Sequence, residues 1–187
     1  MKPEISPRTR TRSNAPSRVR RIAWLISETV YSGSGLRGAG SGGAGAQGVG
    51  YAAPGALGVA LANKSKGLFT VTFQPDGDLM YCPGTLWTAA YHKIPILYVM
   101  HNNRGYHQEA MHLQRMAALH KRRPDQAWIG TVLEKPAIDF AKLAQAQGVW
   151  AEGPIEDPAR LGAALRRAAA VVKGGAPALV DVVCQGR

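Results

Sequence analysis

The chain has 187 residues, 45% of them hydrophobic, which is enough for one α/β domain with a buried core and little more. It contains no apolar run of about 18 residues, so we expect no membrane-spanning helix. Two cysteines, Cys82 and Cys184, lie far apart without the spacing of a metal site. We therefore expect a reduced, cytoplasmic protein rather than a disulfide-bonded one.

The net charge of +11 raises the hypothesis of a nucleic-acid-binding protein, but the charge is concentrated at one end. Residues 1–22 hold seven Lys and Arg against Glu4 alone. This segment is rich in Ser, Pro and Arg, which is typical of a disordered, solvated tail. An organelle-targeting segment and a nucleic-acid-binding arm are alternatives, although three prolines interrupt any amphipathic helix. An upstream coding region that was truncated or read out of register would look the same.

The next part of the chain changes from glycine-rich to regular structure. Ile22–Val30 is a short apolar stretch of undetermined type, and glycine dominates the residues that follow it up to Gly50. Pro54 opens a helix expected over residues 54–63, since proline is favoured in a first turn. We expect a basic, Gly/Ser-rich arm and linker over residues 1–42 and a single domain over residues 43–187.

Strand and helix patterns alternate along the rest of the chain. Strands are predicted over residues 68–73, 94–100, 149–151 and 178–183, and helices over 83–92, 138–148 and 158–173. Residues 111–126 carry a partly helical pattern followed by a basic cluster. This alternation predicts a parallel α/β sandwich.

Polar turns follow two of the predicted strands. Asp76-Gly77-Asp78 comes after the first strand, and Asn102-Asn103 comes after the second. The carboxyl ends of parallel strands form one edge of a sheet, where ligands bind, so the spacing allows Asp76 and Asn103 to meet. A carboxylate, an amide oxygen and turn carbonyls suit Mg²⁺, which usually keeps a phosphate-bearing ligand as well. A plain turn at either position is the alternative.

The stretch Gln74–Gln108 resembles the cofactor-anchoring motif of thiamine diphosphate enzymes, which begins Gly-Asp-Gly and ends Asn-Asn. The likeness is strongest to the group of acetolactate synthase and benzoylformate decarboxylase, and it covers the C-terminal, diphosphate-binding domain. The resemblance implies a three-layer parallel-sheet fold that binds thiamine diphosphate through Mg²⁺. By the same resemblance, Asp76, Asn103 and the carbonyl of Gly105 would be the metal ligands.

The resemblance also implies which residues contact the cofactor, in three short segments. In the family a glycine-rich turn before the first helix lies against the cofactor, and this turn is Gly48-Val49-Gly50 here. Val49 would be the apolar wedge that bends the cofactor, and it is smaller than the usual residue. Gly77 and Asp78 would lie near the diphosphate, together with the first amides of the helix over 83–92. Tyr106 would line the mouth of the site; for His107 and Glu109 a structural or substrate-contact role is favoured over acid/base chemistry.

Two features depart from the family pattern. Pro75 replaces the first glycine of the motif, so one backbone N–H that would contact phosphate is missing. In addition, the glutamate that activates the cofactor belongs, in the family, to a separate pyrimidine-binding domain, for which this chain has no room. No catalytic residue is therefore assigned.

Three functions stay open at this point. The first is the anchoring half of a 2-oxo acid decarboxylase or carboligase (a lyase or transferase), completed by a pyrimidine-binding domain in a homo- or hetero-oligomer. The second is a truncated, non-catalytic remnant of such an enzyme. The third, less favoured, is a basic nucleic-acid-binding protein whose binding would depend on salt and on residues 1–22.

Overall fold

The computed structural model describes residues 49–184. The predicted arm and linker, the stretch Ile22–Val30 and Gly48 lie outside the described residues.

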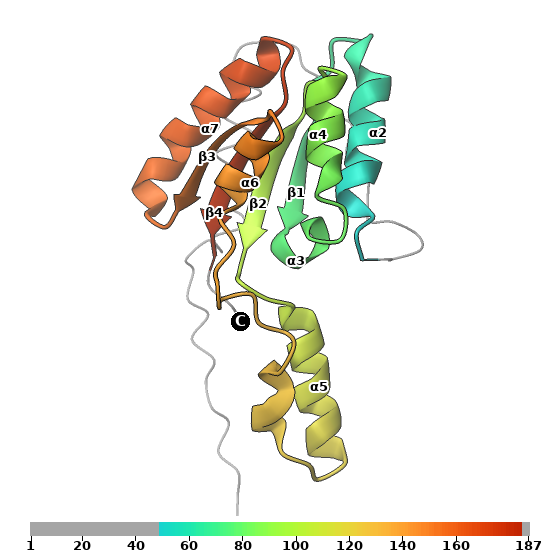
Figure 1. Cartoon of the computed structure of the whole chain (residues 1–187), viewed down its shortest axis with the longest axis vertical. Helices are drawn as coiled ribbons and strands as arrows, with labels where there is room; N and C mark the ends of the chain where they lie inside the picture. The colour runs from blue at the N-terminus through green and yellow to red at the C-terminus, as the bar shows by residue number, and fades with distance from the viewer. Residues whose placement is uncertain (1–48, 185–187) are drawn as a thin grey trace, which may run out of the picture.

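A parallel sheet of four strands forms the centre of the described chain (Figure 1). The strands are β1 (Val71–Pro75), β2 (Leu97–Asn102), β3 (Trp150–Ile155) and β4 (Ala178–Val183), in the spatial order β1-β2-β4-β3. Each neighbouring pair runs parallel. The carboxyl ends of all four strands consequently lie at one edge, which we call the carboxyl edge, and the predicted parallel α/β fold is confirmed.

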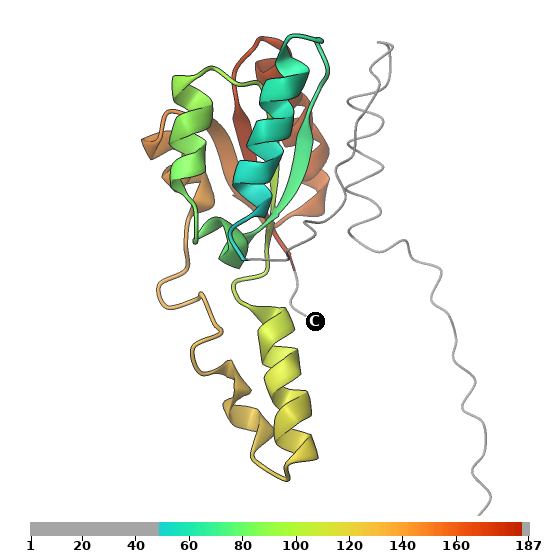
Figure 2. The same cartoon turned by 90° about the vertical axis from the view of Figure 1, so that its right-hand side faces the viewer.

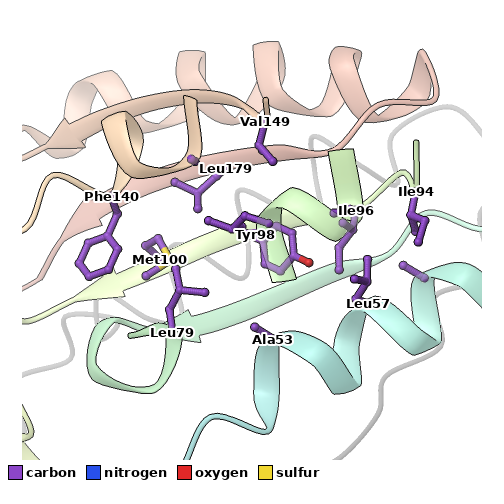
Figure 3. Close-up of a cluster of buried hydrophobic side chains, with 14 residues drawn as sticks. Ala53, Leu57, Leu79, Ile94, Ile96, Tyr98, Met100, Phe140, Val149 and Leu179 are labelled. Atoms are coloured by element: carbon purple, nitrogen blue, oxygen red, sulfur yellow. The ribbon is translucent and has the colours of Figure 1, made fainter. Parts of the chain in front are cut away.

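Helices cover both faces of the sheet and complete three layers. One face packs against α2 (Ala52–Lys64), α4 (Gly84–Tyr91) and α6 (Phe140–Ala146), and the other packs against α7 (Pro158–Lys173). Figure 3 shows the first of these two cores, where Tyr98, Met100 and Leu179 from the central strands lie among residues of the covering helices. In residues 49–184, no helix is both long and apolar enough to cross a membrane.

Local sequence signals explain where the later helices begin. The Asp139 side chain accepts a hydrogen bond from the Lys142 amide at the start of α6, at 2.9 Å. Asp157 caps α7 in the same way through the Ala159 amide, and Pro158 occupies the first helical position. The predicted bounds of α7 and β4, residues 158–173 and 178–183, are confirmed.

Several other predicted bounds were wrong by a few residues. The helices α2 and α4 are predicted within one or two residues, whereas α6 is shorter at both ends than residues 138–148. The strands β1, β2 and β3 extend farther toward their carboxyl ends than predicted. The pairing register, which starts at Val71 opposite Leu97, sets these bounds, and a single strand's side-chain pattern does not contain that information.

Two segments differ more clearly from the prediction. The residues predicted as an acidic, ligand-binding turn form a short helix, α3 (Asp76–Leu79). The segment predicted as one region over 111–126 is a helix α5 (His107–Leu119), a turn and a 3₁₀ helix η1 (Pro124–Trp128). We call residues 107–132 the arm; from here on this name does not refer to the N-terminal segment predicted over residues 1–42. In both views the arm extends beyond the carboxyl edge and away from the helices that cover the sheet (Figures 1 and 2).

Candidate functional site

Asp76 lies at the carboxyl edge, at the point where β1 passes into α3. Its side chain is 2% exposed. Oδ1 accepts a hydrogen bond from the Gly77 amide at 2.9 Å, and Oδ2 accepts one from the Gly105 amide at 3.1 Å. The second bond joins residues 29 positions apart, so it places the end of β1 beside the turn after β2, as the spacing predicted. Burial raises the pKa of Asp76, while the nearby backbone amides act in the opposite direction.

The two asparagines after β2 have different surroundings. Asn102 is buried, and its Nδ2 donates a hydrogen bond to Oδ1 of Asp181 at 3.0 Å. The Oδ1 atom of Asn103 is buried and has no hydrogen-bond partner among residues 49–184. A buried amide oxygen without a partner is costly unless a ligand satisfies it. The structure thus distinguishes Asn103, the predicted ligand, from Asn102, whose side chain is already used.

The turn after β2, which carries the predicted ligands Asn103 and Gly105, is closely packed. Arg104 adopts a positive φ of 61°, and a Cβ on Gly105 would meet the Thr131 carbonyl oxygen at 2.7 Å. The Nε2 atom of His107 lies 2.9 Å from the Asn103 carbonyl oxygen. Because a carbonyl oxygen only accepts, His107 donates here, and its ring also contacts Trp128 edge to face. His107 therefore links the turn to the arm.

Tyr106 covers the beginning of α3. Its hydroxyl donates to the Gly77 carbonyl oxygen at 3.3 Å, and a Cβ on Gly77 would overlap the Tyr106 ring. Only glycine leaves room for this contact. Burial, followed by the neighbouring Tyr81, raises the pKa of Tyr106. Contacts of Gly77 and Tyr106 with a cofactor stay predictions, since the Gly77 amide already donates to Asp76.

The glycine-rich segment before α2 reaches the same edge. Val49 is 50% exposed, whereas Gly50 is buried with φ at 94°. The Gly50 amide donates to Oδ1 of Asp78 at 2.6 Å, and Gln74 Nε2 donates to Oδ2 of the same carboxylate, also at 2.6 Å. The Asp78 side chain, predicted to lie near a diphosphate, is thus occupied by two protein donors.

Two further features of the motif are the backbone at Pro75 and the free amides at the start of α4. Pro75 has φ at −65° and ψ at 144°, which a proline ring adopts without strain, so the replacement leaves the backbone of the turn undistorted. At the start of α4, the amides of Thr85 and Leu86 donate to backbone carbonyls, and the Trp87 amide donates to Gln147. Helix α4 consequently offers an anion fewer free amides than predicted.

Asp181 is a residue of this edge that the sequence interpretation missed. It is fully buried on β4, and burial raises its pKa to about 6 despite the hydrogen bond from Asn102. The backbone of Gly153 lies so close that a Cβ there would be 2.6 Å from the Asp181 Cβ. The available signal was an acidic residue inside the apolar run ALVDVV, which was interpreted only as a strand.

The donor set suits a cation that shares its ligands with a bound anion. Asp76 supplies one carboxylate, and Asn103 supplies a neutral oxygen that has no partner in the described part of the chain. No group of three or more His, Cys, Asp or Glu side chains able to hold a metal occurs in residues 49–184. A transition-metal cage is thus not built by this part of the chain, whereas Mg²⁺ with phosphate oxygens in its shell fits the residues present.

Comparison with known proteins identifies a family that matches most of the chain. The family model described as "Thiamine pyrophosphate enzyme, C-terminal TPP binding domain" matches residues 32–182. A putative acetolactate synthase large subunit, IlvX of Mycobacterium tuberculosis H37Rv, is 32% identical over 133 residues, which are 71% of this chain and 24% of that protein.

Two solved structures are also similar. A thiamine diphosphate-dependent 4-hydroxybenzoylformate decarboxylase of Rhodococcus jostii RHA1 superposes with a TM-score of 0.57 at 26% identity, over 74% of this chain and 23% of that one. A benzoylformate decarboxylase of Polynucleobacter necessarius superposes with a TM-score of 0.53 at 21% identity, over 75% and 24% of the two chains, and supports the fold alone. The chain spans about a quarter of the length of these relatives.

Proposed function

This chain belongs to the family of C-terminal thiamine pyrophosphate (thiamine diphosphate)-binding domains, and from this premise we propose that it anchors the diphosphate of that cofactor through Mg²⁺. The ligands in this proposal are the Asp76 carboxylate, Asn103 Oδ1 and the Gly105 carbonyl oxygen. The observation that carries the proposal is the buried Oδ1 of Asn103, which has no partner among the described residues and lies in the turn whose Gly105 amide binds Asp76.

Charge and coordination number support the same assignment. Mg²⁺ takes six ligands, so three protein oxygens leave room for diphosphate oxygens and water. Burial makes the Asp76 carboxylate unfavourable without a neighbouring positive charge, as its raised pKa indicates. A bound cation would remove that cost. Val49, Gly50, Gly77 and Tyr106 would border the cofactor, and Gly48 would continue this border outside the described residues.

We infer that the complete active site acts on a 2-oxo acid by decarboxylation or carboligation. Thiamine diphosphate supplies the nucleophilic carbon and the electron sink for that chemistry. The residues of this chain would hold and orient the cofactor and exclude water around the metal. Relatives about three times as long include a putative acetolactate synthase subunit and a 4-hydroxybenzoylformate decarboxylase. We propose that a pyrimidine-binding domain, in another chain of an oligomer, supplies the other half.

The test is calorimetric titration of thiamine diphosphate into the purified chain, with Mg²⁺ and then with EDTA. We expect binding that requires Mg²⁺ and is lost in Asp76→Ala. Asp125→Ala is a matched control, because Asp125 is an exposed residue of the arm paired with Arg123. Binding that is equal in Asp76→Ala, or equal in EDTA, would contradict the metal anchor. Failure of the unaltered chain to bind under both conditions would favour the non-catalytic remnant.

A further inference from the structure

One carboxylate joins the segment before α2 to the end of β1. Asp78 is partly buried, and each of its two oxygens accepts a hydrogen bond at 2.6 Å. One donor is the backbone amide of Gly50, which is 28 residues away, and the other is the side-chain amide of Gln74. Gln74 is fully buried and directly precedes Pro75 and Asp76. The Asp78 side chain therefore contacts both the segment before α2 and the end of β1, and these two segments border the candidate metal site.

We propose that Asp78 is a positioning residue that fixes the loop Val49–Tyr51 onto the turn carrying Asp76. It does so by accepting from Gly50 and Gln74 rather than by contacting a diphosphate. The consequence for cofactor binding rests on the proposed function, whereas the connection itself is a property of the cofactor-free chain. Val49, the predicted wedge, directly precedes the residue that Asp78 holds.

Close packing around Gly50 gives the loop a second connection to the turn, beside its bond to Asp78. A Cβ on Gly50 would lie 2.8 Å from the Tyr81 Cβ, so the loop backbone rests directly on Tyr81. The Tyr81 ring in turn contacts Tyr106 edge to face, with ring centroids 6.3 Å apart, and Tyr106 covers Gly77. The loop and the turn are thus connected twice, once by polar groups through Asp78 and once by aromatic rings.

The chemistry of the two partners predicts which substitutions the connection tolerates. Both partners are N–H donors, and a carboxylate only accepts, so it satisfies both at once. Alanine at position 78 removes both acceptors. Asparagine keeps one oxygen as an acceptor for the Gly50 amide. Gln74 Oε1 is buried without a partner among the described residues. If the Gln74 amide rotates, this oxygen can accept from the new N–H₂ group of the asparagine.

Amide hydrogen exchange followed by NMR on the full, cofactor-free chain tests this inference. In the unaltered chain we expect the Gly50 amide to exchange at least about tenfold more slowly than an unstructured peptide. In Asp78→Ala the Gly50 amide should exchange about tenfold faster, while core amides such as that of Val99 stay unchanged. Asp78→Asn should stay close to the unaltered chain. Asp125→Ala, a matched aspartate in the arm, should change nothing at Gly50.

Two results of the exchange experiment would overturn the inference. One is a Gly50 amide that exchanges at the peptide rate in the unaltered chain, a result that needs no variant to fold. The other is an exchange rate that Asp78→Ala leaves unchanged.

A titration with thiamine diphosphate and Mg²⁺ separates this inference from the proposed function. We expect Asp78→Ala to weaken affinity about tenfold at every Mg²⁺ concentration, and unaltered affinity with a freed loop would contradict the positioning role. A chain that binds no cofactor counts against the proposed function alone, because the exchange result stands without it.

Discussion

The carboxyl edge of the sheet and the arm adjoin each other in the sequence, yet they use their side chains differently. At the edge, Asp76 and Asp181 are almost fully buried and bonded to groups distant in the sequence. In α5 only Ala110 is buried, and in η1 only Ala127. The arm exposes large apolar side chains instead, among them Leu119 at 72% and Ile129 at 76%.

The edge is therefore a region whose geometry is fixed by contacts within the chain. The arm is a region whose apolar surface is not covered by other residues within 49–184. The edge is stabilised by bonds that join four separate segments, so a local change there disturbs distant groups. The arm is joined to the edge chiefly by two hydrogen bonds, from the Tyr106 amide to the Thr131 carbonyl at 2.7 Å and from His107 Nε2 to the Asn103 carbonyl at 2.9 Å. Changes in the arm should therefore have local effects. Three substitutions probe this comparison.

The largest effect is expected for Gly105→Ala. The added Cβ would lie 2.7 Å from the Thr131 carbonyl oxygen, a backbone atom that does not move alone. We expect a loss of about 3 kcal/mol in unfolding free energy, together with weaker Mg²⁺-dependent cofactor binding. Denaturant unfolding measures the first quantity and calorimetry the second.

Gly130→Ala is the matched control in the arm. Gly130 has φ at 76° and no atom within 4 Å of an added Cβ, so only backbone strain of about 1 kcal/mol is expected. Equal losses in the two variants would mean that the edge is no more constrained than the arm.

The second effect concerns pH and Asp181. The folded-state pKa of Asp181 is about 6, against an ordinary value of 3.8, so the folded chain binds this proton more tightly than the unfolded chain. Stability from this group is full below about pH 4 and is lost as the pH rises through 6. Asp181→Asn removes that loss, and its oxygen still accepts from Asn102. We expect the variant to gain roughly 2 to 3 kcal/mol relative to the unaltered chain between pH 4 and pH 8.

Urea unfolding of both chains across this pH range provides the measurement. Burial also raises the pKa of Asp76 in the cofactor-free chain, and the Asp76 carboxylate is the smallest of the causes that raise the pKa of Asp181, so most of the Asp76 contribution is common to both proteins. Stability curves that run parallel from pH 4 to pH 8 would show that the Asp181 carboxyl titrates normally despite its burial.

Much of the edge was predictable from the sequence because its signals are local. Apolar runs followed by Asp76 and by Asn102-Asn103 marked two strand ends, and parallel topology placed them together. The choice of Asn103 over Asn102 rested on the family resemblance and stays a prediction; Asn103 is the one whose Oδ1 is buried without a partner among residues 49–184. The bond between Asp78 and Gly50 was not predictable, because nothing in the spacing of two residues 28 apart specifies it. Asp181 was missed because a single acidic residue does not interrupt a strand pattern.

The smallest effect is expected for Ile129→Ser in the arm. Ile129 is 76% exposed, and an exposed position away from any specific contact usually changes stability by less than about 0.5 kcal/mol. Leu179→Ser, in the fully buried core beside Tyr98, is the contrasting variant and should cost several-fold more. Thermal unfolding at two protein concentrations measures both. A loss above about 1 kcal/mol for Ile129→Ser that grows with protein concentration would mean that the exposed side of the arm is covered in solution by another copy of the chain. The arm would then be an interface, and the contrast with the carboxyl edge would lie in which chain supplies the contacts.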